Sequence, residues 1–377
     1  MNKRTEAIDR KKVCFFSGDI TRSGGTERVA ITIANQLAGK QKWEVLFLSV
    51  VEQKEAPFFE IEDGITRYVL SHKKRWIQPG PAYLPLLPKL RRFIKEQDLD
   101  LMIDIDTILD LLTVPARVGI PVKLAAWDHF NYYYEWQSLV YRKFRRWVTR
   151  FTARHADYVV TLTERDAKNY ANVLKRKQKV YTIYNPIEHI LKDTEEHVRE
   201  NMLITAGRLT NVKGIDFLSR LAPKILSRHK DWKWYVLGEG EERKLLEDVR
   251  KKYSLQNQLI LTGNVQNVEE YLKKASIYVM TSRAEGLPMV LLEAAGYKVP
   301  SISFDIQTGP AEIIEDGKTG FLIPPFDLEQ MEEKIELLIQ KAALRKKFAQ
   351  QAEKSRQKFA LDKIVAQWER LLEEIME

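Results

Sequence analysis

Two glutamates eight residues apart, Glu285 and Glu293, are the clearest indication of a binding or catalytic site in this chain of 377 residues. Glu285 lies in a predicted loop, and Glu293 lies one or two turns into a helix that begins near Pro288. The free N–H groups at the start of such a helix attract a phosphate, and each carboxylate accepts hydrogen bonds from hydroxyl groups. A sugar, a diphosphate and a ribose joined in a row, as in a nucleotide sugar, would satisfy this arrangement.

The turn between the two glutamates is the predicted contact for the phosphate. Its backbone N–H groups are unpaired where the helix begins. Helix capping and surface charge produce the same spacing of acidic residues, so the pattern alone leaves both interpretations open. The residues expected to contact a ligand here are Gly286, Leu287, Pro288, Met289 and Val290.

An arginine and a lysine after another predicted strand form a second candidate site. Arg208 follows Gly207, and Lys213 stands five residues further along the chain. A guanidinium group is a planar fork and an ammonium group is a compact point charge, so together they suit a diphosphate. Two solvated surface cations are the ordinary alternative.

A glycine pair near the N-terminus, Gly24 and Gly25, precedes a helix predicted over 27–37. Glycine lets the backbone approach a ligand, and the start of the following helix attracts anions. An ordinary tight turn explains the same residues.

Short apolar runs alternate with amphipathic helical patterns along the whole chain, which is typical of β-α units around parallel sheets. Asn185-Pro186 ends the first series of predicted β-α units, because proline has no N–H group to donate to a neighbouring strand. A polar stretch follows. We predict an N-terminal domain over 1–187, a linker over 188–200 and a C-terminal domain over 201–377, whose last helix is a candidate to return to the N-terminal domain. Two doubly wound domains would face each other across a cleft. The predicted strands are 13–17, 44–51, 101–105, 122–127, 158–162, 180–184, 202–206, 234–237, 259–261, 277–280 and 301–304.

Composition places the chain among globular proteins without a disulfide framework. Hydrophobic residues make up 44% and charged residues 30%, which excludes a largely disordered chain. Cys14 is the only cysteine, so an intrachain disulfide and a cysteine-based zinc site are both excluded. The charged N-terminus shows no secretory signal, and no run approaches the ~20 apolar residues of a membrane span. We therefore expect a cytoplasmic protein.

The excess of positive over negative charge is confined to the first half of the chain. Residues 1–187 contain 32 Lys and Arg against 21 Asp and Glu, whereas the remainder carries a net charge of −2. Within 132–154 the net charge is +5, and aromatic residues recur at helical spacing, which suits a helix lying on anionic lipid. Packing of the aromatic residues on the core is the alternative. Since no nucleic-acid motif is present, we expect an anionic membrane as partner of the N-terminal domain and no nucleic acid.

The order of these motifs resembles the retaining glycosyltransferases of family 4, also called group 1 glycosyl transferases. The resemblance spans roughly residues 13–325 and implies the GT-B fold, in which two Rossmann-like α/β domains face each other. The matching elements are Gly207-Arg208-Leu209 with Lys213-Gly214, Gly238-Glu239-Gly240, Gly263-Asn264-Val265, Glu285 with Glu293, Thr308-Gly309-Pro310-Ala311-Glu312-Ile313-Ile314, and Gly24-Gly25-Thr26-Glu27-Arg28.

The resemblance implies a role for the four charged candidate residues of the C-terminal half. Arg208 and Lys213 would bind the diphosphate of a nucleotide-sugar donor. Glu293 would accept the ribose hydroxyls, and Glu285 would hold the transferred sugar near the reacting carbon.

The remaining contacts of the donor are also implied by the resemblance. Asn264 and Val265 would contact the base through their backbone. From the other domain, Gly24 and Gly25 would approach the phosphate or the acceptor, and His129 would face the sugar.

By this resemblance the protein is expected to be a retaining, metal-independent glycosyltransferase with no cofactor besides its donor substrate. It would move a hexose or an N-acetylhexosamine from a UDP-sugar to a glycan or a polyprenyl-diphosphate-linked acceptor in cell-surface polysaccharide synthesis. Its expected place is the inner face of the cytoplasmic membrane. Two alternatives remain: a non-catalytic nucleotide- or sugar-binding protein, and a metal-dependent transferase of the GT-A type in which Asp104 and Asp106 hold the ion.

Overall fold

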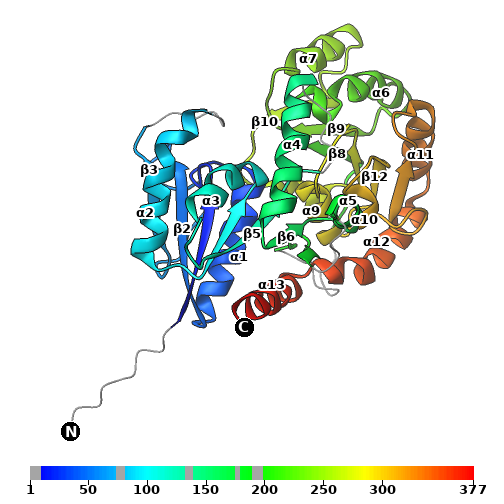
Figure 1. Cartoon of the computed structure of the whole chain (residues 1–377). Coiled ribbons are helices and arrows are strands. Elements are labelled where there is room, and N and C mark those ends of the chain that lie inside the picture. Colours follow the sequence, from blue (N-terminus) through cyan, green and yellow to red (C-terminus); the bar gives the residue numbers. More distant parts are fainter. Residues whose placement is uncertain (1–9, 74–80, 132–138, 175–178, 189–197) are drawn as a thin grey trace.

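The computed structural model describes residues 10–73, 81–131, 139–174, 179–188 and 198–377. The chain forms two α/β domains, each built on one parallel sheet, and Figure 1 shows them side by side. Consecutive residues of a strand point to opposite faces of its sheet. Phe15 accordingly joins one core cluster, whereas Cys14 and Phe16 join another.

The N-terminal sheet contains seven parallel strands in the order β3-β2-β1-β4-β5-β6-β7. Its strands are β1 (Lys11–Ser17), β2 (Trp43–Val51), β3 (Thr66–Ser71), β4 (Leu101–Ile105), β5 (Lys123–Asp128), β6 (Tyr158–Thr161) and β7 (Val180–Thr182). The α-helices of this domain are α1 (Gly25–Gly39), α2 (Leu87–Gln97), α3 (Asp110–Ala116), α4 (Leu139–His155) and α5 (Glu164–Leu174).

The C-terminal sheet contains six parallel strands in the order β10-β9-β8-β11-β12-β13. Its strands are β8 (Met202–Ala206), β9 (Lys233–Leu237), β10 (Leu259–Gly263), β11 (Ile277–Met280), β12 (Ser301–Phe304) and β13 (Gly320–Ile323). The α-helices are α6 (Ile215–Arg228), α7 (Arg243–Lys252), α8 (Val268–Lys274), α9 (Met289–Gly296), α10 (Pro310–Ile313), α11 (Leu328–Gln340), α12 (Ala342–Arg356) and α13 (Leu361–Met376).

The sequence located the inner strands well and missed two outer ones. The predicted bounds of β4, β8, β11 and β12 match the structure residue for residue. Parallel strands covered on both faces are continuous apolar runs, which is why they are visible in the sequence. The missed strands, β3 and β13, lie at the edges of their sheets, and each contains partly exposed positions that weaken the apolar signal.

Helix α13, drawn in red in Figure 1, packs against the N-terminal domain. The buried ring of Trp368 lies 4.7 Å from the ring of Trp127, centroid to centroid. Just before the helix, the carbonyl of Phe359 accepts a hydrogen bond of 2.7 Å from the N–H of Ile187. One continuous apolar cluster therefore includes side chains of both sheets and of α13.

None of the helices in the described part of the chain is long and apolar enough to cross a bilayer.

Candidate functional site

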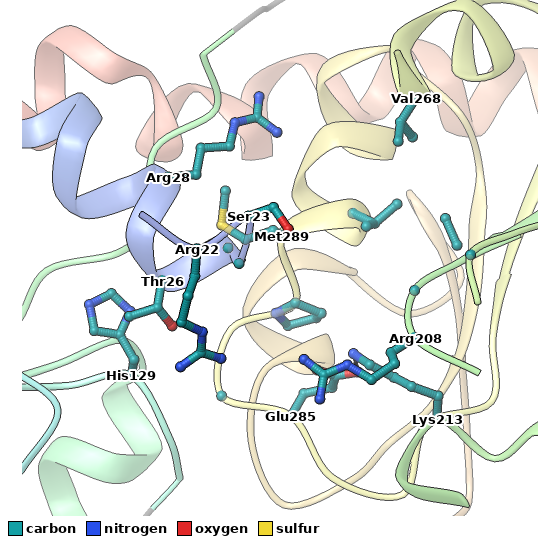
Figure 2. Close-up of a pocket in the computed structure, with 18 of the residues that line it drawn as sticks. Arg22, Ser23, Thr26, Arg28, His129, Arg208, Lys213, Val268, Glu285 and Met289 are labelled. Carbon is teal, nitrogen blue, oxygen red and sulfur yellow. Dashed lines mark hydrogen bonds and ion pairs between the residues drawn. The ribbon is translucent and has the colours of Figure 1, made fainter. Parts of the chain in front are cut away.

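A cavity of about 1000 Å³ lies between the two domains. Its walls come from loops at the carboxyl ends of strands in both sheets, which is where ligands bind in doubly wound folds. The structure brings every predicted site residue to this cavity (Figure 2). They are Gly24, Gly25, His129, Arg208, Lys213, Asn264, Val265, Glu285, Gly286, Leu287, Pro288, Met289, Val290 and Glu293.

Lys213 forms an ion pair with Glu285, with 2.6 Å between Nζ and Oε1. A short 3-10 turn positions the lysine and ends at Gly214, whose φ is 66°. A Cβ atom at Gly214 would lie 2.0 Å from the carbonyl oxygen of Thr281, so only glycine fits there. The hydroxyl of Thr281 donates a hydrogen bond of 3.0 Å to the carbonyl of Lys213, and this contact fixes the turn to the end of β11.

Arg208 lies in the loop after β8 and is exposed. Figure 2 shows its side chain on the same side of the cavity as Lys213 and Glu285. Among the residues that the structure describes, no ion pair or hydrogen bond engages its guanidinium group. This fork of donors is therefore available to an anionic ligand.

The loop that carries Glu285 is held from both domains. The carbonyl of Glu285 accepts hydrogen bonds from the hydroxyl of Thr308 at 2.6 Å and from the side-chain amide of Asn131 at 3.0 Å. A Cβ atom at Gly286 would lie 2.5 Å from the carbonyl oxygen of His129, so the two domains meet closely at this glycine. The loop then enters α9, which places Glu293 along the same wall.

Glu293 is paired with a residue of the other domain. Its Oε1 lies 2.5 Å from Nη1 of Arg28, a residue of α1. Tyr278 is buried, and its burial, together with the nearby charges of Glu285 and Glu293, raises the pKa of its hydroxyl well above the usual range. Arg28 belongs to the glycine-loop motif, but the sequence predicted no role for it, because nothing in the sequence links it to Glu293.

His129 follows β5 and is almost fully buried. Burial lowers its pKa to about 3, so the imidazole is neutral at ordinary pH. Its Nε2 atom has no hydrogen-bond partner among the described residues, and the side chain lines the cavity. A neutral imidazole in this position can donate or accept one hydrogen bond with a ligand.

The glycine loop brings the N-terminal domain close to α9. A Cβ atom at Gly25 would lie 3.2 Å from Cγ of Met289. A Cβ atom at Gly24 would lie 2.3 Å from a carboxylate oxygen of buried Glu27. Arg22 of the same loop also lines the cavity and was not singled out from the sequence, and Glu27 was quoted there only as part of the glycine loop.

Asp104 and Asp106, the metal ligands of the GT-A alternative, lie outside the cavity lining. Asp104 is completely buried on β4, where burial raises the pKa of its carboxyl to about 7. Asp106 accepts a hydrogen bond of 2.7 Å from Arg145 of α4. In the described part of the chain, no group of three or more His, Cys, Asp and Glu side chains is arranged for a metal. The alternative is wrong, because its two carboxylates are built into the N-terminal domain and do not reach the cleft.

Two family models match consecutive parts of the chain. The model described as Glycosyltransferase Family 4 matches residues 23–189, and the one described as Glycosyl transferases group 1 matches residues 186–355. Their junction falls between the two sheets of the structure.

Similar proteins support the same assignment. The amylovoran biosynthesis glycosyltransferase AmsD of Erwinia amylovora is 29% identical over 374 residues, which is 96% of this chain and 99% of the relative. A Campylobacter jejuni α-1,4-N-acetyl-D-galactosaminyltransferase acting on GalNAc-α-(1→4)-GalNAc-α-(1→3)-diNAcBac-PP-undecaprenol is 25% identical over 374 residues, 97% of this chain and 99% of the relative.

Solved structures show the fold. The pneumococcal O-GlcNAc transferase GtfA, in complex with UDP and GlcNAc, superposes with a TM-score of 0.80 at 16% identity, covering 98% of this chain and all of that one. The matching family models, the full-length relatives and the two facing parallel-sheet domains lead to one conclusion. The chain belongs to the group 1 glycosyl transferases of the GT-B fold, and it is a glycosyltransferase enzyme.

Proposed function

We propose that the protein is a retaining glycosyltransferase that moves a hexose or an N-acetylhexosamine from a UDP-sugar to a glycan or a polyprenyl-diphosphate-linked acceptor. The observation that carries the proposal is the pair of cations, Arg208 and Lys213, placed beside Glu285 in the cleft. The relatives' names support a role in cell-surface polysaccharide synthesis, since one is named for amylovoran and the other for an undecaprenol-diphosphate-linked glycan. The UDP and GlcNAc in the GtfA structure support the donor class.

The donor would lie along the wall formed by the C-terminal domain. Its diphosphate would contact Arg208, Lys213 and the N–H groups at the start of α9, and its ribose hydroxyls would donate to Glu293. The base would lie beside Asn264 and Val265, which line the same cavity.

The bond that breaks joins the anomeric carbon of the sugar to the diphosphate oxygen. Negative charge develops on the departing diphosphate, and the two fixed cations stabilise that charge more in the transition state than in the ground state. The acceptor oxygen forms its bond on the same face of the sugar, and its proton passes to a departing phosphate oxygen. Retention of the anomeric configuration follows without a covalent enzyme intermediate.

Neutral His129 would hold a hydroxyl of the transferred sugar from the N-terminal side. Because the ring is almost fully buried, one hydrogen bond from it to a ligand would be worth more than at an exposed position. Glu285, on the opposite wall, would accept from a second hydroxyl and so fix the sugar between the two domains.

We propose that the cations replace a metal ion in this reaction, so that transfer persists in the presence of a chelator. The expected partner of the N-terminal domain is the anionic inner face of the cytoplasmic membrane, reached through α4. The described part of this helix carries six Lys and Arg side chains and no acidic one. Residues 132–138, which belong to the same predicted segment, lie outside the described residues.

A panel of radiolabelled UDP-sugars, incubated with the protein and a membrane extract as the source of acceptor, tests the proposal. One sugar of the panel is expected to enter a lipid- or glycan-linked product, equally well with and without EDTA. Binding of the donor without transfer or hydrolysis would instead identify a non-catalytic binding protein. The anomeric proton coupling of the product, read by NMR, decides between retention and inversion.

A further inference from the structure

Arg28, in the first turn of α1, contacts two separate parts of the molecule. Its Nη1 atom reaches Glu293 of the C-terminal domain at 2.5 Å. Its Nε and Nη2 atoms each lie 3.1 Å from a different carboxylate oxygen of Glu188, the first residue of the predicted linker. The hydroxyl of Thr32, one turn further along α1, donates a hydrogen bond of 2.9 Å to the same Glu188 carboxylate.

The planar fork of an arginine suits this double task. The two donors that face Glu188 match the two oxygens of a carboxylate, and a third donor remains for a second carboxylate. A lysine has one ammonium group on a flexible chain and cannot hold both partners in fixed positions. All three side chains are largely shielded from water, with exposures of 30% for Arg28, 22% for Glu188 and 17% for Glu293. The pairs are therefore weakly screened.

The position of Glu293 makes this contact relevant to the donor. Arg28 and Glu293 both line the cleft, and Glu293 is the carboxylate that the proposed function assigns to the ribose. Arg28 reaches Glu293 only when the two domains lie close together, because the residues are 265 positions apart and belong to different domains. The carboxylate of Glu293 would thus contact both Arg28, which joins the two domains, and the donor. Closure of the cleft and binding of the donor would therefore be coupled in free energy, and we call the contacts of Arg28 with Glu188 and Glu293 the clamp.

We propose that Arg28 is a positioning residue that closes the cleft, by holding the start of the linker and the donor-binding carboxylate of Glu293 to α1 at the same time. The inference rests on the proposed function for the role of Glu293. It adds to the donor site a residue of the N-terminal domain, Arg28, whose contacts would complete the site when the cleft closes.

The test compares Arg28→Ala, Arg28→Lys and Glu188→Gln with Arg228→Ala. The last variant is a matched control, since Arg228 also contacts two glutamates, Glu332 and Glu336, but on the surface of the C-terminal domain. Spin labels on cysteines introduced at the exposed positions Glu96 and Lys251 report the distance between the domains, because native Cys14 is buried. Distances are measured without nucleotide and with UDP, and UDP affinity and turnover are measured separately.

We expect Arg28→Ala to shift the distances to longer values and to lower turnover at saturating substrates about tenfold or more, the factor that corresponds to about 1.4 kcal/mol in the barrier. UDP affinity is expected to fall by less than about tenfold, because closure and donor binding are coupled but the residues of the C-terminal wall remain in place. Arg28→Lys and Glu188→Gln are expected to give intermediate shifts, and they replace Arg28→Ala if that variant does not fold. Arg228→Ala should behave like the wild type.

Two results would overturn the inference. Unchanged distances and turnover in Arg28→Ala would show that the contact does not control closure. Loss of UDP affinity beyond about tenfold with unchanged distances would make Arg28 a direct donor ligand instead. If the wild type itself does not bind UDP, the proposed function fails, whereas the distances measured without nucleotide still test the clamp.

Discussion

Each carboxylate of the Glu285–Glu293 pair has a cation beside it, Lys213 in one case and Arg28 in the other. Both carboxylates are largely buried, with exposures of 11% and 17%. Removing a cation from such a pair leaves a charge that water compensates poorly. At the scale of single residues, the site is therefore sensitive to loss of charge.

Replacing Lys213 or Arg208 with alanine is expected to lower turnover by tens of fold or more at saturating donor. Each removes a fixed positive charge aimed at the departing diphosphate, and loss of one such donor costs ~10²–10³ in a well-characterised hydrolase. Steady-state assays with the identified UDP-sugar measure the effect. Lys224→Ala, a surface lysine paired with Glu332, is the control and should retain full turnover. Wild-type rates in both Lys213→Ala and Arg208→Ala would remove the proposed role.

His129 is expected to remain neutral in the folded protein from pH 8 down to pH 5, since burial lowers its pKa from 6.5 to about 3. In the unfolded chain His129 binds a proton near pH 6.5, whereas in the folded chain it stays neutral. The free energy of unfolding should therefore fall as the pH drops below 6.5. NMR of the histidine side chains, assigned with His129→Gln, follows the ring directly. Denaturant unfolding at pH 7.5 and pH 5 should show a smaller pH dependence for His129→Gln. A ring of His129 that titrates near 6.5 in the folded protein contradicts this prediction.

At the scale of elements, α4 has two unlike faces. On the inner face, buried Arg145 binds Asp106 and lies 4.7 Å from the ring of Phe130, next to the cleft residue His129. On the outer face, the rings of Phe144, Trp147, Phe151 and His155 stack in a row along the helix. Val148, which belongs to the same sequence stripe, is buried, so the stripe divides between the core and the surface.

The outer face of α4 is expected to bind vesicles that contain anionic lipid. Trp147 is 53% exposed among the exposed cations Lys143, Arg146, Arg150 and Arg154. Trp147→Ser should weaken vesicle binding about fivefold or more, because an aromatic ring at the headgroup level and nearby basic charges both contribute to binding. Cosedimentation at low and high salt measures binding, and Tyr253→Ser, which removes a similarly exposed aromatic of the C-terminal half, serves as control. Equal binding of Trp147→Ser and wild type would place the contact elsewhere.

At the scale of the whole molecule, the chain crosses between domains twice. It passes through the linker once and then returns, since α13 packs on the N-terminal domain after the C-terminal sheet is complete. The apolar cluster that joins the two sheets includes Trp127, Trp368 and Leu291. Movements of the two domains must therefore pivot around this shared core.

Trp368→Ala is expected to lower the free energy of unfolding by about 3–5 kcal/mol, the usual cost of truncating a large buried aromatic. The ring is completely buried against Trp127, and the cavity left behind would lie at the junction of the domains. Urea unfolding followed by circular dichroism measures the loss. Arg370→Ala, an exposed position on the same helix, should be nearly neutral. A small effect at Trp368 would mean that α13 contributes little to holding the domains together.

The sequence by itself determined the class of fold and singled out the candidate residues of the C-terminal cavity wall. Strands buried on both faces are continuous apolar runs, and this made the inner strands and the two-domain order predictable. Arg208 and Lys213 lie in one short segment and Glu285 and Glu293 in another, far along the chain. The spacing left their roles open, and the resemblance to a known family pointed to a shared site. The same reasoning found Glu285, Glu293, Arg208 and Lys213, which the structure places in one cavity.

Only the tertiary structure decided which residues of the two domains contact each other across the cleft. Arg28 meets Glu293 across 265 residues, and Asn131 meets the carbonyl of Glu285 across 154. The edge strands β3 and β13 depend on which surfaces pack together, and so does the contact of α13 with the N-terminal domain, for which the sequence offered the last helix only as a candidate. Such contacts are set by the relative position of two separately folded sheets, and no local pattern of residue types records that position.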